Sequence, residues 1–252
     1  MTICKNCNTH FEGNFCSECG QSADTHEINS HFLWYDIQQG LLNLDKGILF
    51  TLKELSTRPG YSIKEFIEGQ RVRHFKPISF LLVLAGIYGF VIHYFDIALL
   101  VKEIPDADAK KVINVTKILD WISANYALST LILIPISSLS TYWAFKKERY
   151  NFIQHIVINA FVAGFHIILR LIFFPLVFLF DKKDSLGVLT IPDIIGIAYT
   201  CWVLLQLFDY LPLKSRILKI ILSYIFLALL YLSFVLISGF VVGFLLAMAE
   251  HK

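Results

Sequence analysis

The sequence is poor in charged residues. Asp, Glu, Lys and Arg make up 17% of its 252 residues, whereas about 25% is usual for a soluble domain. The formal net charge is only +2, so the chain lacks the strongly basic character of a nucleic-acid-binding protein, and we expect no nucleic-acid partner. Walker-type glycine-rich loops and the H-E-x-x-H, G-x-S-x-G and D-x-x-x-D patterns are also missing. These absences leave enzymatic activity undecided and make it the less favoured interpretation.

Apolar residues, by contrast, are abundant and clustered. Hydrophobic residues make up 56% of the chain, and the mean hydropathy is +0.61. A transmembrane helix needs about 20 consecutive apolar residues, and five segments meet this requirement. We therefore predict an all-α polytopic membrane protein with about five transmembrane helices, which excludes an ordinary soluble enzyme, a disordered chain and a secreted disulfide scaffold. The predicted bundle covers residues 77–252, with spans at about 77–95, 125–145, 151–180, 191–211 and 217–248.

Four of the five cysteines lie within the first nineteen residues. The pattern C-x2-C-x8-C-x2-C turns two thiols of each pair toward one point, and two such pairs complete a tetrahedral S4 site for zinc. An iron site uses the same ligands and stays an alternative, whereas disulfides need an oxidising compartment. Because cysteines fill all four positions, the metal is expected to be structural and not catalytic. Residues 1–22 are thus predicted to form a zinc ribbon with the ligands Cys4, Cys7, Cys16 and Cys19.

Residues 23–76 form a juxtamembrane segment with an amphipathic pattern. Apolar residues recur every three or four positions from Trp34 to Leu55, which predicts one continuous helix. The segment is too polar to cross a bilayer. We expect it either to lie on the membrane surface or to pack on the bundle or on a second copy of the chain.

The sequence Arg58-Pro59-Gly60 should end this helix, because the residue before a proline is disfavoured in the helical conformation. Ser62 and Glu65 form a capping-box pattern, which predicts the start of a short helix that ends near Gly69. A basic collar follows directly before the first span, where it either fixes the topology or binds anionic lipid head groups. The collar comprises Arg71, Arg73 and Lys76.

Basic residues in the loops predict the orientation of the spans. Nine Lys or Arg residues fall within about 19 loop residues on one side, and seven fall within about 41 residues on the other. We therefore predict a multi-pass protein of the bacterial cytoplasmic (inner) membrane, with the N-terminus in the cytoplasm and the C-terminus outside. The denser set is Arg71, Arg73, Lys76, Lys146, Lys147, Arg149, Lys214, Arg216 and Lys219.

The third span carries four polar residues at spacings of 4, 7 and 4, which place them on one helical face. Ionisable residues inside a membrane are costly and usually face a bundle interior or a watery cavity. Either the outermost ones reach the head groups, or all form a buried polar track. Asp209 of the fourth span would pair with Lys214 or Arg216, or else meet His155 and carry protons or a cation. The candidate track comprises His155, Asn159, His166, Arg170 and Asp209.

Small residues recur at every fourth position of the fifth span, at Gly239, Gly243 and Ala247. Such a stripe lets another helix approach closely. Packing within the bundle and homo-oligomerisation both remain open.

Several short motifs resemble an uncharacterised bacterial membrane protein family, in which an N-terminal zinc ribbon precedes a multi-span domain of unknown function. The resemblance covers nearly the whole chain and implies the same architecture, but no known activity. Many relatives look like Y-x-E-H at the start of the third span, whereas Gln154 replaces the Glu here and fewer histidines follow. This difference weakens a metal or proton site in the track. The matching motifs are Cys4-Lys5-Asn6-Cys7, Phe15 to Gln21, Thr51 to Leu55, Arg58-Pro59-Gly60, Gly69-Gln70-Arg71 and Lys76-Pro77.

Together these features favour a membrane-anchored adaptor or regulator whose cytoplasmic zinc ribbon binds a protein partner. Membrane lipids are the other expected partners. The rival interpretation is a transporter of a small molecule, an ion or a lipid that uses the polar track in the third and fourth spans. Because no internal repeat is evident and five spans do not divide into an inverted pair, we favour the adaptor.

Overall fold

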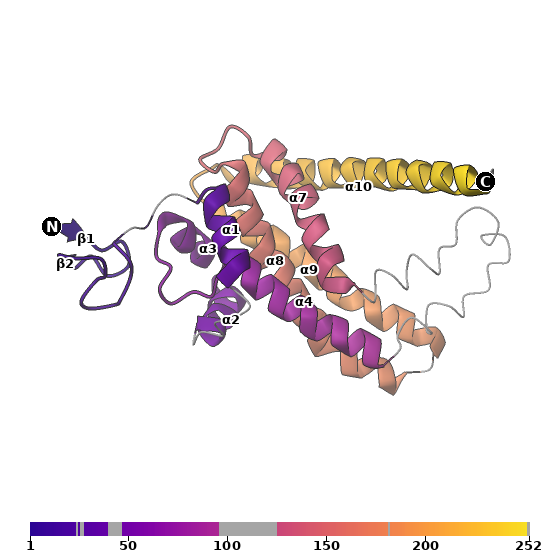
Figure 1. Cartoon of the computed structure of the whole chain (residues 1–252), viewed down its shortest axis with the longest axis horizontal. Coiled ribbons are helices and arrows are strands. Elements are labelled where there is room, and N and C mark those ends of the chain that lie inside the picture. Colours follow the sequence, from indigo (N-terminus) through magenta and orange to yellow (C-terminus); the bar gives the residue numbers. More distant parts are fainter. Residues whose placement is uncertain (24, 26–27, 40–46, 96–124, 181, 251–252) are drawn as a thin grey trace.

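The computed structural model describes residues 1–250 except residues 24, 26–27, 40–46, 96–124 and 181. Within these residues, five helices are long and apolar enough to cross a membrane, which confirms the predicted all-α fold with five candidate spans. The sizeable outer loop predicted at 96–124 lies outside the described residues. Figure 1 shows the spans gathered in one bundle, with the last part of α10 reaching beyond the others. The candidate spans are α4 (Pro77–Tyr94), α7 (Tyr126–Ala144), α8 (Phe152–Phe173), α9 (Lys182–Leu207) and α10 (Leu213–Glu250).

The third predicted span, residues 151–180, consists of α8 followed by the 3-10 helix η2 (Phe174–Leu179). A capping box starts α8: the Asn151 side chain accepts a hydrogen bond from the Gln154 N–H, and the Gln154 side chain accepts one from the Asn151 N–H. Glutamine serves in this motif as glutamate does, so Gln154 keeps a structural role at this position. Pro175 lies in the first turn of η2, where its lack of an N–H prevents a further α-helical turn.

The segment before the first span contains two helices in place of the single helix predicted from Trp34 to Leu55. These are α1 (Ser30–Gln39) and α2 (Gly47–Thr57), and residues 40–46 between them lie outside the described residues. Helix α1 packs against α4, whereas α2 packs against α3 and α8. Leu55 is buried and Trp34 is 61% exposed. For α2, therefore, the expectation of packing on the bundle holds.

Helix α3 (Pro59–Glu68) begins four residues earlier than the Ser62–Glu65 pattern predicts, with Arg58 and not Ser62 as the N-cap, so that capping-box prediction was wrong. Pro59 occupies the first turn, where its fixed φ favours helix initiation and its missing N–H costs nothing. Ser62 is instead buried inside the helix. The predicted end is confirmed, because Gly69 adopts a left-handed φ of 116° at the C-cap.

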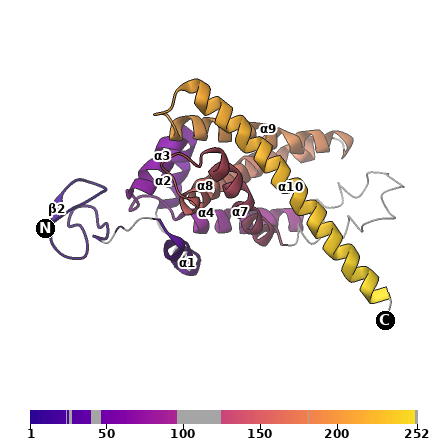
Figure 2. The same ribbon diagram turned by 90° about the horizontal axis from the view of Figure 1, so that it is seen from above.

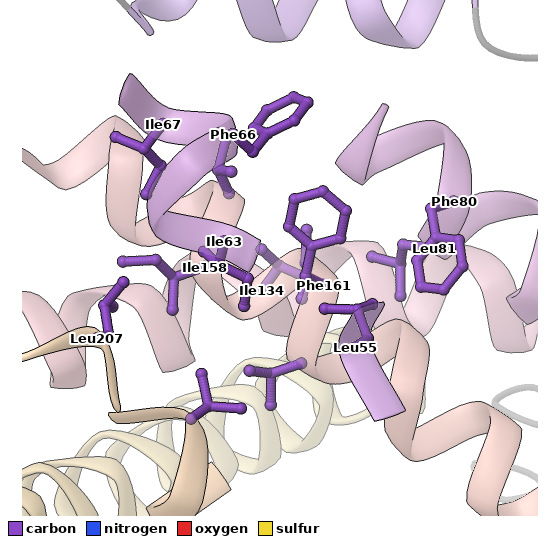
Figure 3. Close-up of a cluster of buried hydrophobic side chains, with 14 of the residues drawn as sticks. Leu55, Ile63, Phe66, Ile67, Phe80, Leu81, Ile134, Ile158, Phe161 and Leu207 are labelled. Atoms are coloured by element: carbon purple, nitrogen blue, oxygen red, sulfur yellow. The ribbon is translucent and has the colours of Figure 1, made fainter. Parts of the chain in front are cut away.

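One hydrophobic core joins α3 to the candidate spans. Figure 3 shows Phe66 of α3 beside Phe161 of α8, and their ring centroids are 5.3 Å apart in an edge-to-face contact. Phe80 of α4 lies 6.1 Å from Phe161 on a centroid-to-centroid basis. Figure 2, a view of the bundle from above, shows α2 and α3 at the end nearest the ribbon. The packing therefore holds the juxtamembrane helices firmly on that end.

Candidate metal centre and the polar clusters of the bundle

The N-terminal cysteines come together as the sequence predicts. Strands β1 (Thr2–Ile3) and β2 (His10–Phe11) pair antiparallel and close the first cysteine turn. All four Sγ atoms lie within 4.8 Å of one another. The Sγ atoms of Cys4 and Cys19 are 3.5 Å apart, as are those of Cys7 and Cys16. A tetrahedral site with metal–sulfur bonds of about 2.3 Å has sulfur–sulfur edges of about 3.8 Å, so four thiolates in this arrangement fit a metal ion.

Two similar turns present the thiols. The Asn8 N–H donates to the Cys4 carbonyl, and the Gly20 N–H donates to the Cys16 carbonyl in the same relative position. Asn8 and Gly20 have φ values of 59° and 74°. Asparagine and glycine are the residues that adopt this left-handed conformation most readily, which explains their positions after each cysteine pair.

Cys7 is the exposed member of the set. Hydrogen bonding with the Thr9 side chain and backbone lowers the pKa of Cys7 to about 6. A thiol must lose its proton to bind a metal, so this environment favours loading at neutral pH. Thr9 was not singled out by the sequence pattern, because its role depends on the closed turn.

Gln21 connects the ribbon to the loop before the first span. Its backbone carbonyl accepts a hydrogen bond from the Cys16 N–H, and its side-chain Oε1 accepts one from the Arg71 N–H at 3.1 Å. Gln21 is only 4% exposed. Nearby, a Cβ placed on Gly69 would lie 2.7 Å from Cδ of Lys5, so the two segments approach closely there. The ribbon is thus docked on the loop that leads into α4.

The basic collar is not a uniform lipid-facing surface. The Arg71 guanidinium lies 4.9 Å above the Phe32 ring and donates a hydrogen bond to the Phe66 carbonyl. Burial lowers the pKa of Arg71 to about 10. Arg73 is exposed, whereas Lys76 is half-buried. Arg71 therefore has a packing role that neither expectation for the collar included.

The motif Arg58-Pro59-Gly60 lies where the juxtamembrane helices pack closely against the spans. Arg58 binds Glu54 of α2 and Glu65 of α3, and hydrogen bonding with Glu65 is the main cause of its raised pKa. The Gly60 N–H donates to Oε1 of Gln206 on α9 at 2.9 Å. A Cβ on Gly60 would lie 2.5 Å from the Val203 carbonyl oxygen, so only glycine fits.

The candidate polar track separates into distinct clusters. Near the ribbon end, His155 Nδ1 and Asn159 Nδ2 lie 3.0 and 2.9 Å from the Thr141 hydroxyl of α7. Further along α8, His166 Nε2 lies 3.0 Å from the Thr200 hydroxyl of α9. His155 and Asn159 are buried, which agrees with the buried alternative for His155 and not with a position at the head groups. Each pair joins two neighbouring helices, and the partner threonines could not be identified from sequence spacing.

Arg170 of α8 also binds side chains of neighbouring helices, and it is half-buried. Its Nη2 atom lies 2.8 Å from Oδ1 of Asp193 on α9, and its Nη1 atom donates to the Tyr126 hydroxyl of α7 at 2.6 Å. This pair compensates the charge of a group that would otherwise be costly among apolar helices. The sequence reasoning missed both partners.

Asp209 falls within the fourth span predicted at 191–211, but it lies beyond the end of α9, which stops at Leu207. Its carboxylate is 3.6 Å from Nζ of Lys64 on α3. Neither expected partner is found among the described contacts: the ion pair is not with Lys214 or Arg216, and His155 is not its neighbour. The turn after α9 points Asp209 toward the juxtamembrane helices, which excludes it from a track with His155.

Further ion pairs gather the loops at the ribbon end of the bundle. Arg149 lies 3.6 Å from Glu68, and Lys219 lies 2.8 Å from Glu148. The loop before α4, the α7–α8 turn and the start of α10 therefore share one end, as alternating membrane crossings require. The side of the membrane on which this end lies stays a prediction.

The fold and the cysteine site define the class: a helical, multi-pass type of membrane protein with an N-terminal four-cysteine cluster able to hold a metal ion. A family model described as "Protein of unknown function (DUF3667)" matches residues 45–89. This stretch includes α2, α3 and much of α4, with the Arg58-Pro59-Gly60 junction and Gly69. No curated protein and no solved structure shows significant similarity to the chain.

Proposed function

We propose that this protein is a membrane-anchored adaptor or regulator in which a zinc-loaded ribbon binds a cytoplasmic protein partner. The observation that carries the proposal is the closed set of four thiols on a ribbon that is itself docked on the loop before the first span. A site whose ligands are all cysteines has no open position for substrate or water, so its role is to hold a surface in shape.

The ribbon surface supports the proposal of a partner. Phe15 lies between the two cysteine pairs and is 67% exposed, and Ile3 on β1 is 58% exposed. Exposed apolar side chains on so small a unit favour a contact with another protein. Because Gln21 fixes the ribbon against the loop before α4, a partner bound there would lie next to the bundle.

The proposed location is the bacterial cytoplasmic membrane with the ribbon inside. Support comes from the dense basic residues of loops that share the ribbon end. Fusion of alkaline phosphatase to the C-terminus should give an active enzyme, whereas the same fusion after residue 76 should be inactive. The reverse pattern would overturn the orientation.

The decisive experiment is purification from native membranes in mild detergent, with zinc, iron and co-purifying proteins measured together. Four versions are compared: wild type, Cys4→Ser/Cys7→Ser, Phe15→Ser, and Cys201→Ser as a cysteine control outside the site. We expect zinc and a defined partner with wild type and control, zinc without partner for Phe15→Ser, and neither for the double variant. Equal recovery of that partner by the zinc-free protein would refute the proposal. Iron found in a stoichiometric amount would identify iron, and not zinc, as the metal of the site.

Transport through the polar track receives no support from the geometry. His155, His166, Arg170 and Asp209 are each engaged with different partners. The described residues do not arrange them along one continuous path, so we do not propose a transporter.

A further inference from the structure

A cavity of about 540 Å³ lies among α7, α8 and α10, away from the ribbon. Its volume is in the range of small-molecule sites. Leu133, Ile167 and Leu227 contribute to its largely apolar wall. On α10, the lining residue Ala228 is exposed and Tyr231 is 54% exposed, so the cavity opens sideways between helices that would face lipid.

The cavity runs along the helices from the end far from the ribbon to the middle of the bundle. On α7 its lining extends from Tyr126 to Ser137. The eleven helical steps between these two residues cover about 16 Å, which is close to half of a hydrocarbon core about 30 Å thick. The cavity therefore has the length of one leaflet, and Arg170 lies at its outer end with Tyr126.

Hydrogen-bond donors gather at that outer end. Within the described part of the chain, Arg170 donates one N–H from Nε and one from each terminal nitrogen, so two of its five N–H groups remain. The Tyr126 hydroxyl accepts from Arg170, and its own hydrogen has no acceptor in the described part of the chain. Arg170 and Tyr126 both line the cavity.

This donor set calls for a ligand that supplies several acceptor oxygens. Asp193 receives both of its hydrogen bonds from Arg170 on Oδ1, and it is not among the lining residues. The side of the guanidinium that faces the cavity is thus still able to bind an oxyanion. A phosphate meets this need, because arginine binds its oxygens through charge-assisted hydrogen bonds.

We propose that this cavity binds one membrane phospholipid, with its phosphate on Arg170 and one acyl chain along α7 and α10. The site belongs to the leaflet opposite the ribbon. The inference is independent of the zinc ribbon and of any cytoplasmic partner.

Native mass spectrometry of the delipidated full-length protein, titrated with phosphatidylglycerol, tests the proposal. One lipid should be retained more tightly than all later ones. Diacylglycerol, which lacks the phosphate, should bind at least tenfold more weakly, since a hydrogen bond to a charged group contributes about 1.5–3 kcal/mol. Equal retention of the two probes would refute the phosphate assignment.

Paired variants separate lipid binding from a structural role of the ion pair. Arg170→Gln and Asp193→Asn both break the pair, but only the first removes the cation, so only Arg170→Gln should lose the tight lipid. Ala228→Phe should block the cavity, whereas Leu229→Phe, at an exposed neighbouring position that does not line it, should not. Thermal unfolding of each variant verifies that it is folded. Unchanged retention in folded Ala228→Phe, or only uniformly weak surface lipid in wild type, would overturn the proposal.

Discussion

The side chain of Gln21 accepts a hydrogen bond from the backbone N–H of Arg71, fifty residues further along the chain. Gln21 follows Cys19, the last cysteine of the ribbon, by two residues, and Arg71 precedes the first span by six. The position of the ribbon relative to the membrane entry is therefore fixed by a residue that binds no metal. This contact explains how a small unit joined through a short linker keeps a defined place.

Replacement of Gln21 by Ala should release the ribbon from the bundle without loss of metal. One buried hydrogen bond contributes about 1 kcal/mol, and the Cys16 N–H bond to the backbone of residue 21 is retained. We expect faster hydrogen exchange at the Arg71 amide together with unchanged zinc content. Glu18→Ala, an exposed ribbon position, is the control. Identical exchange in the two variants would contradict the docking role of Gln21.

Gly60→Ala should destabilise the whole bundle. The new methyl group would lie 2.4 Å from Cβ of Gln206 and 2.5 Å from the Val203 carbonyl oxygen. The backbone of Val203 cannot move aside as the end of a flexible side chain can. We therefore expect a loss of about 1–3 kcal/mol in the free energy of unfolding. Thermal unfolding in detergent measures the change.

The matched control for this substitution is Gly86→Ala, also in a helix. A Cβ on Gly86 would meet nothing within 4 Å. Alanine is the better helix former, so stability should stay the same or rise by up to about 1 kcal/mol. A similar loss in both variants would show that the α3–α9 contact is not the cause.

Acid should loosen the juxtamembrane helices through His74. Its Nδ1 faces the Gln70 carbonyl at 3.0 Å, so that nitrogen carries the proton, and its Nε2 is 3.0 Å from the Ser62 hydroxyl. Burial is the main cause of the lowered pKa of His74; Glu65 and Glu54 act in the opposite direction, and Arg58 adds to the lowering.

Because the folded pKa lies below that of the unfolded chain, the unfolded state binds more protons as the pH falls below the ordinary histidine pKa of about 6.5. Stability should therefore decrease between about pH 6.5 and the lower folded pKa. Thermal unfolding of wild type and His74→Gln at pH 7.5 and 5.5 checks this. A pH response of the same size in both proteins would assign it to other groups.

Removal of the metal by a chelator should unfold the ribbon and spare the bundle. The buried residues of the ribbon core are Cys4, Phe11 and Cys16, with Cys19 and Ala23 partly buried, too few to fold without metal. Limited proteolysis should then cut within residues 1–22. Helical circular dichroism should not change, since the described part of the ribbon has two short strands and no helix. A fall in helix content would mean that the bundle depends on the metal.

Sequence patterns located the features that depend on near neighbours. Cysteine spacing placed the four thiols, and Gly69 marked the end of α3, because turns and caps form within a few residues. The start of α3 was misjudged, since Pro59 and the Ser62–Glu65 pattern are both valid local signals and burial of Ser62 beside His74 decided between them. The helix predicted from Trp34 to Leu55 became two, because α1 and α2 pack on different parts of the protein.

By itself, the sequence determined that this chain forms apolar helices of membrane-spanning length and a four-cysteine cluster. Hydropathy and short-range spacing are properties of the chain alone. Only the tertiary structure decided that Arg170 pairs with Asp193, that His155 and Asn159 meet Thr141, and that Asp209 turns away to Lys64. Those pairings depend on which helix faces meet, and that is set by the packing of the whole bundle around the close contact at Gly60 and the core at Phe66 and Phe161.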